Sequence, residues 1–343
     1  MSKTAEMVSI GHPDKIADYI SSSLLDKMIK SDPYVKYAVE VMIKNNTVVL
    51  GGEVTGNVSG IDLLSCVKSG LRDIGYDERY AGIWGENALD INKINIVNMI
   101  GVQSNDIAQG VENNGWGDQG VFVGYACRGD GFVNRELYLA RKLNRAIYDA
   151  ARESNNLGLD IKTQITIDDH GAIDTAIVAV PMQKYTDLTD FIVSVLGVRP
   201  RHIIINGTGV YRQHSSIADC GITGRKLACD FYSTAVPIGG GSPWTKDGTK
   251  ADLTLNLYAR YLAIKNLGDN DECRVFLSSC IGRAELPDAR IETIKNGHMS
   301  VQKLQCNIMP RDLIKLFKLD TPVYAKMCRD GLCDYVLSII QNE

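Results

Sequence analysis

Residues 13–54 read PDKIADYISSSLLDKMIKSDPYVKYAVEVMIKNNTVVLGGEV, and the first part of this stretch has helical spacing. Apolar side chains recur there every four residues, which places them on one face of an amphipathic helix; they are Ile16, Ile20, Leu24 and Met28. Pro13 suits the first turn of such a helix, where an N–H group has no partner to lose. Asp14 then lies at the positive end of the helix dipole. The stretch therefore begins with a helix that buries one face.

Two apolar segments follow this helix. Residues 37–43 and 47–54 are rich in Val and Ile, and Asn45-Asn46 lies between them. This arrangement predicts two strands joined by a tight hairpin turn. Residues 63–74 carry a second apolar stripe at helical spacing. The sequence thus predicts a helix, a hairpin and a second helix in succession.

The same order of elements recurs along the rest of the chain. Further helices are expected near 136–153, 187–196, 252–267 and 310–318, and further strands near 94–100, 120–127, 162–168, 172–180, 201–206, 273–281 and 288–294. This pattern lacks the regular βαβα alternation of a parallel sheet and predicts an α+β fold with antiparallel or mixed sheets. No Pro/Gly-rich linker divides the chain, so we expect residues 1–343 to form one compact unit.

Composition excludes several classes of protein. The chain has 343 residues, 45% hydrophobic and 23% charged, with a formal net charge of −4. Proteins that coat nucleic acid are usually strongly basic, so we expect no nucleic-acid partner. The nine cysteines form no CxxC pair and are not clustered with the five histidines, which disfavours a zinc site or a disulfide framework. No run approaches the ~18 apolar residues of a membrane span. A soluble cytoplasmic protein with reduced thiols is expected.

Four glycine-containing segments are candidates for ligand binding: residues 11–15, 117–120, 219–226 and 239–252. Glycine lets backbone N–H groups approach an anion closely, and helix starts attract anions. Arg and Lys in the last two segments supply positive charge. Each segment by itself is also compatible with an ordinary cap, turn or hairpin, and taken alone the segments 219–226 and 239–252 favour that structural interpretation. The polar stretch 103–116 is either a mobile lid or a surface loop.

Common phosphate and nucleophile motifs are missing from the sequence. It contains no GxxxxGK[ST] loop, no GxGxxG after a strand, no protein-kinase set and no GxSxG elbow. The sequence therefore supports neither a P-loop nor a dinucleotide fold, and neither a kinase nor a serine hydrolase.

Together, six segments resemble the S-adenosylmethionine synthetase family. They are GHPDKIAD at 11–18, GGE at 51–53, QSNDIAQG at 103–110, GDQG at 117–120, DCGITGRK at 219–226 and GGGSPWTKDGTK at 239–250. They occur in the family's order with nearly the family's spacing. The resemblance extends from about Glu6 to Pro287, with weaker matches to roughly Tyr324.

This resemblance implies a fold, a reaction and a quaternary structure. The fold is three interleaved α+β subdomains around a pseudo-threefold axis. The reaction joins the sulfur of L-methionine to the adenosyl group of ATP, with hydrolysis of the tripolyphosphate to phosphate and pyrophosphate. Mg²⁺ and K⁺ are the implied cofactors. The implied assembly is a homodimer with active sites between its subunits, and a tetramer is also compatible with the resemblance.

The resemblance also assigns roles to individual residues. It implies catalytic roles for His12, Lys162, Arg225, Lys226, Lys246 and Asp118. It implies that ATP contacts His12, Lys162, Tyr211, Asp219, Arg225, Lys226, Ser242 and Lys246. It implies that methionine contacts Glu53, Gln103, Asp219 and Lys250. Asp14 and Asp252 are the implied Mg²⁺ ligands and Glu40 the implied K⁺ ligand. Residues 103–117 correspond to a lid.

Some positions depart from the family pattern. Ile10 stands in place of Glu, Val210 and Leu253 each stand in place of Arg, and residues 212–218 replace a glycine-rich stretch. The lid is several residues short, and the usual His-Phe-Pro-Trp C-terminus is missing. We expect an active but divergent enzyme.

Two alternatives remain open. One is a catalytically silent ATP- or S-adenosylmethionine-binding regulatory paralogue, and the other is a different ATP-dependent enzyme such as a phosphotransferase or a tripolyphosphatase. Retention of the phosphate-binding cations argues against a silent protein. Retention of Glu53, Gln103 and Lys250 argues against an enzyme that needs no methionine.

Overall fold

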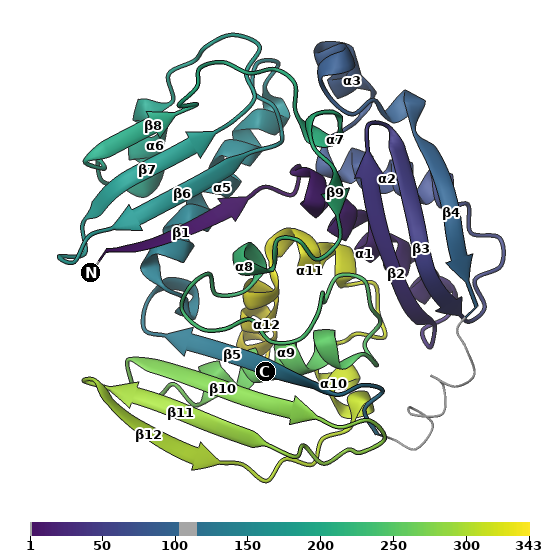
Figure 1. Ribbon diagram of the computed structural model, residues 1–343, viewed down its shortest axis with the longest axis vertical. Coiled ribbons are helices and arrows are strands. Elements are labelled where there is room, and N and C mark those ends of the chain that lie inside the picture. Colours follow the sequence, from purple (N-terminus) through teal and green to yellow (C-terminus); the bar gives the residue numbers. More distant parts are fainter. Residues whose placement is uncertain (1, 103–114) are drawn as a thin grey trace.

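The computed structural model describes residues 2–102 and 115–343, and in this part of the chain the strands form three four-stranded sheets (Figure 1). Each sheet contains an antiparallel hairpin that follows a long helix in the sequence. The three long helices cover one face of their sheets. The strand order is β4-β3-β2-β9 in the first sheet, β1-β6-β7-β8 in the second and β12-β11-β10-β5 in the third.

The first sheet follows α1, and it contains the hairpin expected from residues 37–54. Strands β2 and β3 pair antiparallel, and β4 returns parallel to β3 after the second helix, α2. The bounds are α1 Pro13–Ser31, β2 Lys36–Lys44, β3 Thr47–Thr55, α2 Leu63–Ile74, β4 Asn95–Gly101 and β9 Gly221–Ile222.

The second sheet repeats this plan. A helix, an antiparallel hairpin, a second helix and a parallel returning strand follow one another. The bounds are α5 Arg135–Glu153, β6 Lys162–Ile167, β7 Ile173–Ala179, α6 Thr189–Leu196, β8 His202–Ile205 and β1 Lys3–Val8.

The third sheet departs from the plan at its end. Strand β12 follows β11 directly as a second hairpin, and helices pack only after it. The bounds are α9 Ala251–Lys265, β10 Glu272–Ser279, β11 Ala289–Lys295, β12 His298–Lys303, β5 Gly120–Cys127, α10 Pro310–Leu316, α11 Tyr324–Asp330 and α12 Leu332–Gln341.

The fourth strand of each sheet comes from a different repeat. Strand β1 precedes α1 in the chain but pairs with β6, β5 precedes α5 but pairs with β10, and β9 precedes α9 but pairs with β2. Each repeat therefore contributes one strand to its neighbour, in a cycle. This topology confirms the predicted fold of three interleaved α+β subdomains with pseudo-threefold symmetry. That residues 1–343 form one compact unit without a linker-delimited domain stays a prediction.

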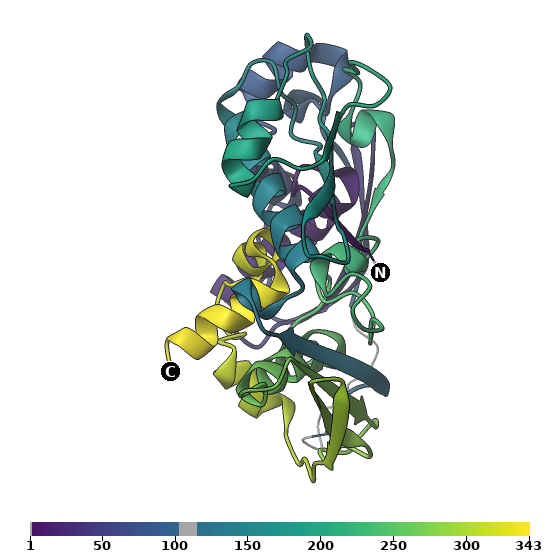
Figure 2. The ribbon, with the colours of Figure 1, turned by 90° about the vertical axis from the view of Figure 1, so that its left-hand side faces the viewer.

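In the C-terminal part of the molecule, helices and strands form separate layers. Seen edge on, the C-terminal helices lie on one side and the strands of the third sheet on the other (Figure 2). Helix α1 is buried on almost every face, including Asp18, Ser21 and Ser22. Spacing alone identified only one of its buried faces, because the second is polar.

Several elements were absent from the sequence analysis. Strand β12 has every residue exposed, so it shows no apolar alternation. Strand β1 and helices α3 (Glu78–Trp84), α11 and α12 were also not assigned. Residues 207–224 are mostly irregular but contain the short helix α7 (Ser215–Ala218) and the short strand β9, and α8 (Leu227–Asp230) follows them. None of the described helices combines the length and the apolarity that crossing a bilayer requires.

Candidate active site

The N-terminus of α1 is the centre of the candidate site. His12 is the N-cap residue, and its Nδ1 accepts a hydrogen bond from the backbone N–H of Asp14 at 3.2 Å. Gly11 packs tightly here, since an added Cβ would lie 2.4 Å from the carbonyl oxygen of Leu159. The Tyr76 hydroxyl donates to the carbonyl of Gly11 at 2.7 Å. The start of the helix is therefore fixed on several sides.

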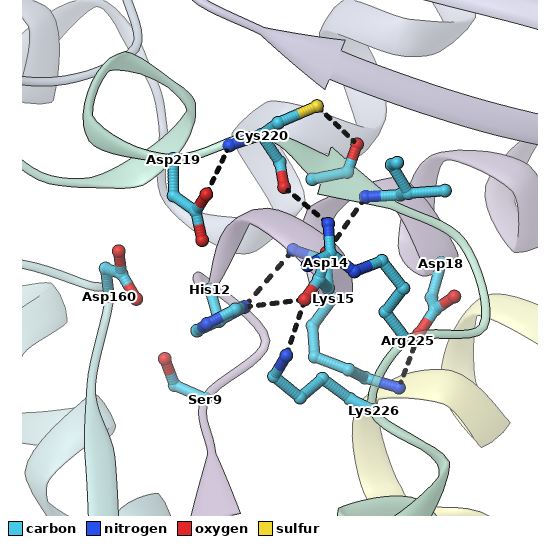
Figure 3. A network of polar contacts seen from close by, with 12 residues as sticks. Ser9, His12, Asp14, Lys15, Asp18, Asp160, Asp219, Cys220, Arg225 and Lys226 are labelled. Atoms are coloured by element: carbon cyan, nitrogen blue, oxygen red, sulfur yellow. Dashed lines mark hydrogen bonds and ion pairs between the residues drawn. The ribbon is translucent and has the colours of Figure 1, made fainter.

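Asp14 forms ion pairs with two cations of the distant segment 219–226 (Figure 3). Lys226 Nζ lies 2.5 Å from Asp14 Oδ2, and Arg225 Nε lies 3.8 Å from Asp14 Oδ1. The backbone N–H of Ile222 also donates to Asp14 Oδ1 at 2.9 Å. Gly221 allows this approach, because a Cβ there would lie 2.1 Å from the carbonyl oxygen of Pro13. The segments 11–18 and 219–226 thus meet at one carboxylate.

A buried cluster of charges surrounds Lys15, the residue that follows Asp14. Lys15 Nζ is 2.7 Å from Asp230 Oδ1 and 3.0 Å from Asp18 Oδ2, and all three side chains are at most 2% exposed. The Trp244 indole N–H donates to Asp230 at 2.8 Å. Burial alone would lower the pKa of Lys15, but the two aspartates outweigh this effect and raise it. Lys15 therefore stays charged.

The same buried cluster reaches two further segments. The backbone N–H of Gly224 donates to Asp18 Oδ1 at 2.9 Å. Lys15 Nζ lies 4.6 Å from the centre of the Trp244 ring, a cation–π contact. These contacts join α1 to segment 219–226 and to segment 239–252.

A second pair of charges lies at the start of α9. Lys246 Nζ forms an ion pair with Asp252, and the backbone N–H of Gly241 donates to the same carboxylate at 2.7 Å. A Cβ at Gly241 would lie 3.1 Å from Asp252 and 3.2 Å from Lys246 Nζ, so the glycine leaves room for the pair. The run of glycines expected to cradle an anion therefore packs around a lysine and an aspartate.

Glu40 on β2 connects the loops that carry the two groups of cations. Its carboxylate accepts hydrogen bonds from the hydroxyls of Thr223 and Thr245, the second at 3.1 Å. The loop around Lys246 runs beside β2 like a further strand, with the N–H of Val39 donating to the carbonyl of Thr245 at 3.0 Å. One strand thus supports both loops.

Burial and positive charge set the protonation of His12. Desolvation, together with Lys226 and Lys162, lowers the pKa of His12 to about 3. His12 is therefore neutral near pH 7 and offers a ring N–H or an acceptor rather than a positive charge. Lys162, at the start of β6, is an exposed cation close enough to influence this ring.

Asp160 is a site residue that the sequence analysis missed. Its Oδ2 accepts from the backbone N–H of Ser215 at 3.0 Å, whereas its buried Oδ1 has no hydrogen-bond donor among the described residues. Burial raises the pKa of Asp160 to about 6, and Lys162 opposes this shift. The available signal was its position two residues before the expected cation Lys162.

The chain matches two family models and a known relative. Residues 1–105 match the S-adenosylmethionine synthetase N-terminal domain, and residues 213–337 match the C-terminal domain of the same family. The chain is 33% identical over 359 aligned positions to an S-adenosylmethionine synthase of Syntrophobacter fumaroxidans (strain DSM 10017 / MPOB), covering 94% of this chain and 90% of that protein. The chain belongs to the S-adenosylmethionine synthetase family.

A solved structure shares the whole fold. An unusual S-adenosylmethionine synthetase from Campylobacter jejuni superposes with a TM-score of 0.86 at 31% identity and covers 99% of both chains. The α+β architecture is therefore that of the family.

Not all residues expected in the site are joined by contacts. Asp219 and His12 lie in the same neighbourhood (Figure 3), and Asp219 influences the pKa of His12. Ser242 packs closely against Gly224, since a Cβ added to this glycine would lie 2.8 Å from the Cβ of Ser242. Tyr211 is near enough to Asp160 for that carboxylate to help raise the pKa of its phenol, although burial is the larger cause.

Other expected residues lie apart from these groups. Among residues 2–102 and 115–343, no hydrogen bond or ion pair links Glu53, Asp118 or Lys250 to His12, Asp14 or Lys246. Glu53 is half-buried on β3, Asp118 is exposed just before β5, and Lys250 is the N-cap residue of α9. Gln103 and most of the expected lid 103–117 lie outside the described residues.

Departures from the family pattern occupy structural positions. Ile10 and Leu253 are buried in the core, whereas Val210 is 41% exposed. In the stretch 212–218, His214 is buried against Tyr80 and Trp84, and desolvation lowers its pKa to about 4. His214 therefore packs this stretch against an aromatic cluster.

The side chains at the implied metal-binding positions Asp14, Asp252 and Glu40 offer only oxygen atoms as ligands. Among the described residues no group of three or more His, Cys, Asp or Glu side chains is arranged to hold a metal ion. Mg²⁺ does not require such a group, since it commonly binds one or two carboxylates together with substrate phosphates and water. Asp14 and Asp252 each face a lysine and fit this chemistry. Glu40 with two threonine hydroxyls offers oxygen atoms to K⁺.

The buried His12 predicts a pH-dependent stability. Below pH 6.5 the imidazole of His12 takes up a proton in the unfolded chain, whereas in the folded protein it does so only near pH 3. The stability that the neutral ring contributes is therefore lost as the pH falls from 6.5 to about 3. At pH 5 the loss is about 2 kcal/mol, from 1.36 kcal/mol per pKa unit. His12→Asn keeps a capping oxygen but takes up no proton. When the pH is lowered from 7.5 to 5, the free energy of unfolding of His12→Asn in urea should therefore rise by about 2 kcal/mol relative to that of the wild type.

His170→Asn is the matched control, because its side chain is 87% exposed, and it should show no such gain. An equal pH dependence in the wild type and in His12→Asn would contradict the assigned protonation.

Proposed function

We propose that this protein transfers the adenosyl group of ATP to the sulfur of L-methionine, with hydrolysis of the tripolyphosphate to phosphate and pyrophosphate. The observation that supports this most strongly is the gathering of Arg225 and Lys226 around Asp14 at the N-terminus of a buried helix. A helix N-terminus with adjacent cations is well suited to bind phosphate oxygens. Membership of the S-adenosylmethionine synthetase family supports the same general reaction.

The chemistry explains why cations matter more than a base. A thioether sulfur carries no proton, so its attack on the ribose C5′ needs no general base. Negative charge instead builds up on the departing triphosphate. Preorganised positive groups aimed at that charge are the most effective form of catalysis here. In this proposal His12, Lys162, Arg225, Lys226 and Lys246 contact the triphosphate, and Tyr211 stacks on adenine.

A methionine pocket and metals complete the proposal. Glu53, Gln103, Asp219 and Lys250 bind methionine, and Asp118 acts at the same centre. Asp14 and Asp252 would hold Mg²⁺, which when bound neutralises phosphate charge, and Glu40 would hold K⁺. When phosphates bind, Lys226 and Lys246 exchange their aspartate partners for phosphate oxygens.

A homodimer is part of this proposal. The sheet faces turned away from the helices expose large apolar side chains, which is unusual for a surface that stays in water. Met99 is 68% exposed on β4, and Val121 is 57% exposed on β5. If active sites form between two subunits, residues that lie apart in one chain, such as Glu53 and Asp118, complete a site with the partner. We also propose a cytoplasmic location.

A direct assay tests the proposed reaction. The purified protein is incubated with ATP, methionine, Mg²⁺ and K⁺, and the products are S-adenosylmethionine, phosphate and pyrophosphate in equal amounts. Binding of ATP without any product would instead support a silent regulatory paralogue. Phosphate release without S-adenosylmethionine would support a different ATP-dependent enzyme.

Lys246 is expected to contribute strongly to turnover. Lys246→Ala should lower it by ~100-fold or more, the usual cost of removing one preorganised contact to the transition state. Lys142→Ala, on the exposed side of α5, is the matched control and should leave turnover unchanged. Equal turnover in Lys246→Ala and the wild type would remove this lysine from the site.

Quaternary structure provides a further test. Analytical ultracentrifugation of the wild type should show a dimer or a tetramer. Because Met99 is expected to be covered, Met99→Asp should shift the population towards monomer and lower turnover together with it. A fully monomeric wild type with full activity would exclude a site shared between subunits.

A further inference from the structure

A cavity separate from the cation groups lies near the C-terminal end of α1. Its volume is about 310 Å³, within the usual range for small-molecule sites. Its walls come from the end of α1, the approach to β2, the loop 247–249 and helix α10 with the turn that follows it. These segments are distant in the chain and meet only in the folded protein.

Apolar side chains form most of the lining. Ile29, Val35 and Leu319 are buried at its base, and Ile314 is partly buried on α10. Such a surface binds the apolar part of a ligand by removing it from water.

Charged lining residues are mostly positive. Lys36, Arg311 and Lys315 line the cavity, and Lys36 and Lys315 form no ion pair with any of the described residues. Asp247 also lines it, but its carboxylate accepts hydrogen bonds from the backbone N–H groups of Tyr37 and Thr249, at 2.7 and 2.8 Å. Asp320 is exposed and is the other acidic lining residue. Three cations, of which Arg311 also pairs with Asp312 outside the lining, thus stand against two carboxylates, so the lining carries a net positive charge.

We infer that this cavity binds a small amphipathic anion, with its apolar body against Ile29, Val35 and Ile314 and its negative group near Lys36, Arg311 and Lys315. The two parts of this ligand follow from the two parts of the lining. A cation would meet a net positive wall, and a fully polar anion would leave the apolar base unused.

The cavity wall continues directly into the candidate active site. Residues 247–249 connect Lys246, paired with Asp252, to Lys250, the N-cap residue of α9. Gly248 packs closely against α10 and the residues after it, since a Cβ there would lie 2.8 Å from Leu319 Cβ and 3.0 Å from Ile314. A ligand in the cavity presses on this loop, and any shift is transmitted to both lysines. Occupancy therefore lowers turnover, a consequence that rests on the proposed function.

Binding is tested first, without any assay of activity. Anilinonaphthalene sulfonate, an apolar anion whose fluorescence rises in apolar surroundings, is titrated into the wild type in the presence of methionine and a non-hydrolysable ATP analogue. Ile314→Trp, which fills the cavity, should abolish one saturable component. Lys315→Glu should weaken that component about three- to tenfold at low salt, and less at high salt.

Two matched variants control for general effects. Val198→Trp adds the same bulk at a position 48% exposed in the bend between α6 and β8, and Lys318→Glu reverses an exposed charge just beyond α10; neither residue lines the cavity. Both should bind the probe as the wild type does. A component that survives in Ile314→Trp, or that weakens equally in Lys318→Glu, would overturn the assignment.

Coupling is tested by inhibition of S-adenosylmethionine formation by the same probe. The probe concentration that halves turnover should rise about three- to tenfold in Lys315→Glu, in parallel with the weaker binding. Binding without inhibition would retain the anion site and refute its coupling to Lys246. Cavity-dependent binding by a protein that makes no S-adenosylmethionine would refute the proposed function and leave the site intact.

Discussion

A lysine buried between two aspartates at the start of α1 is the interaction on which the candidate site depends. Lys15 is 2% exposed and lies within ion-pair distance of both Asp18 and Asp230. Removing one partner from a buried ion pair typically costs 3–5 kcal/mol, because the remaining charge stays in a medium of low polarity. The cluster therefore favours one arrangement of the three segments that contribute to it.

Those segments are the same ones that carry the cations. Asp18 holds the backbone of Gly224 in the segment ending at Lys226, and Asp230 holds Trp244, two residues before Lys246. Two further carboxylates complete the connections. Asp14 pairs with Arg225, and Glu40 accepts hydrogen bonds from Thr223 and Thr245 in the loops that carry the cations. A site whose charges are positioned before the substrate binds loses little energy to reorganisation during the reaction. The buried cluster is thus a means of orienting charges that lie more than 200 positions apart in the chain.

The sequence allowed prediction of local structure and of candidate residues, but not of how they meet. Apolar spacing located α1 and the β2–β3 hairpin because one side of each faces the core. It could not identify the polar buried side of α1, since Asp18 and Ser22 look like solvent-facing residues until their partners are known. It also could not locate β12, whose residues are all exposed, or pair β9 with β2, because the pairing joins residues about 180 positions apart. The sequence analysis did not identify Asp160, because its raised pKa comes from burial near Lys162 in the folded protein, which no local sequence pattern indicates.

The central claim is that buried charges position the phosphate-binding cations, and Lys15→Met tests it most directly. The measurement is calorimetric titration of tripolyphosphate into the folded variant, well below its unfolding midpoint, with Lys142→Met on the exposed side of α5 as the matched control. The account predicts at least tenfold weaker binding in Lys15→Met, since ~1.4 kcal/mol of lost preorganisation is enough for that change, and wild-type affinity in the control. Wild-type affinity in a folded Lys15→Met protein would contradict it.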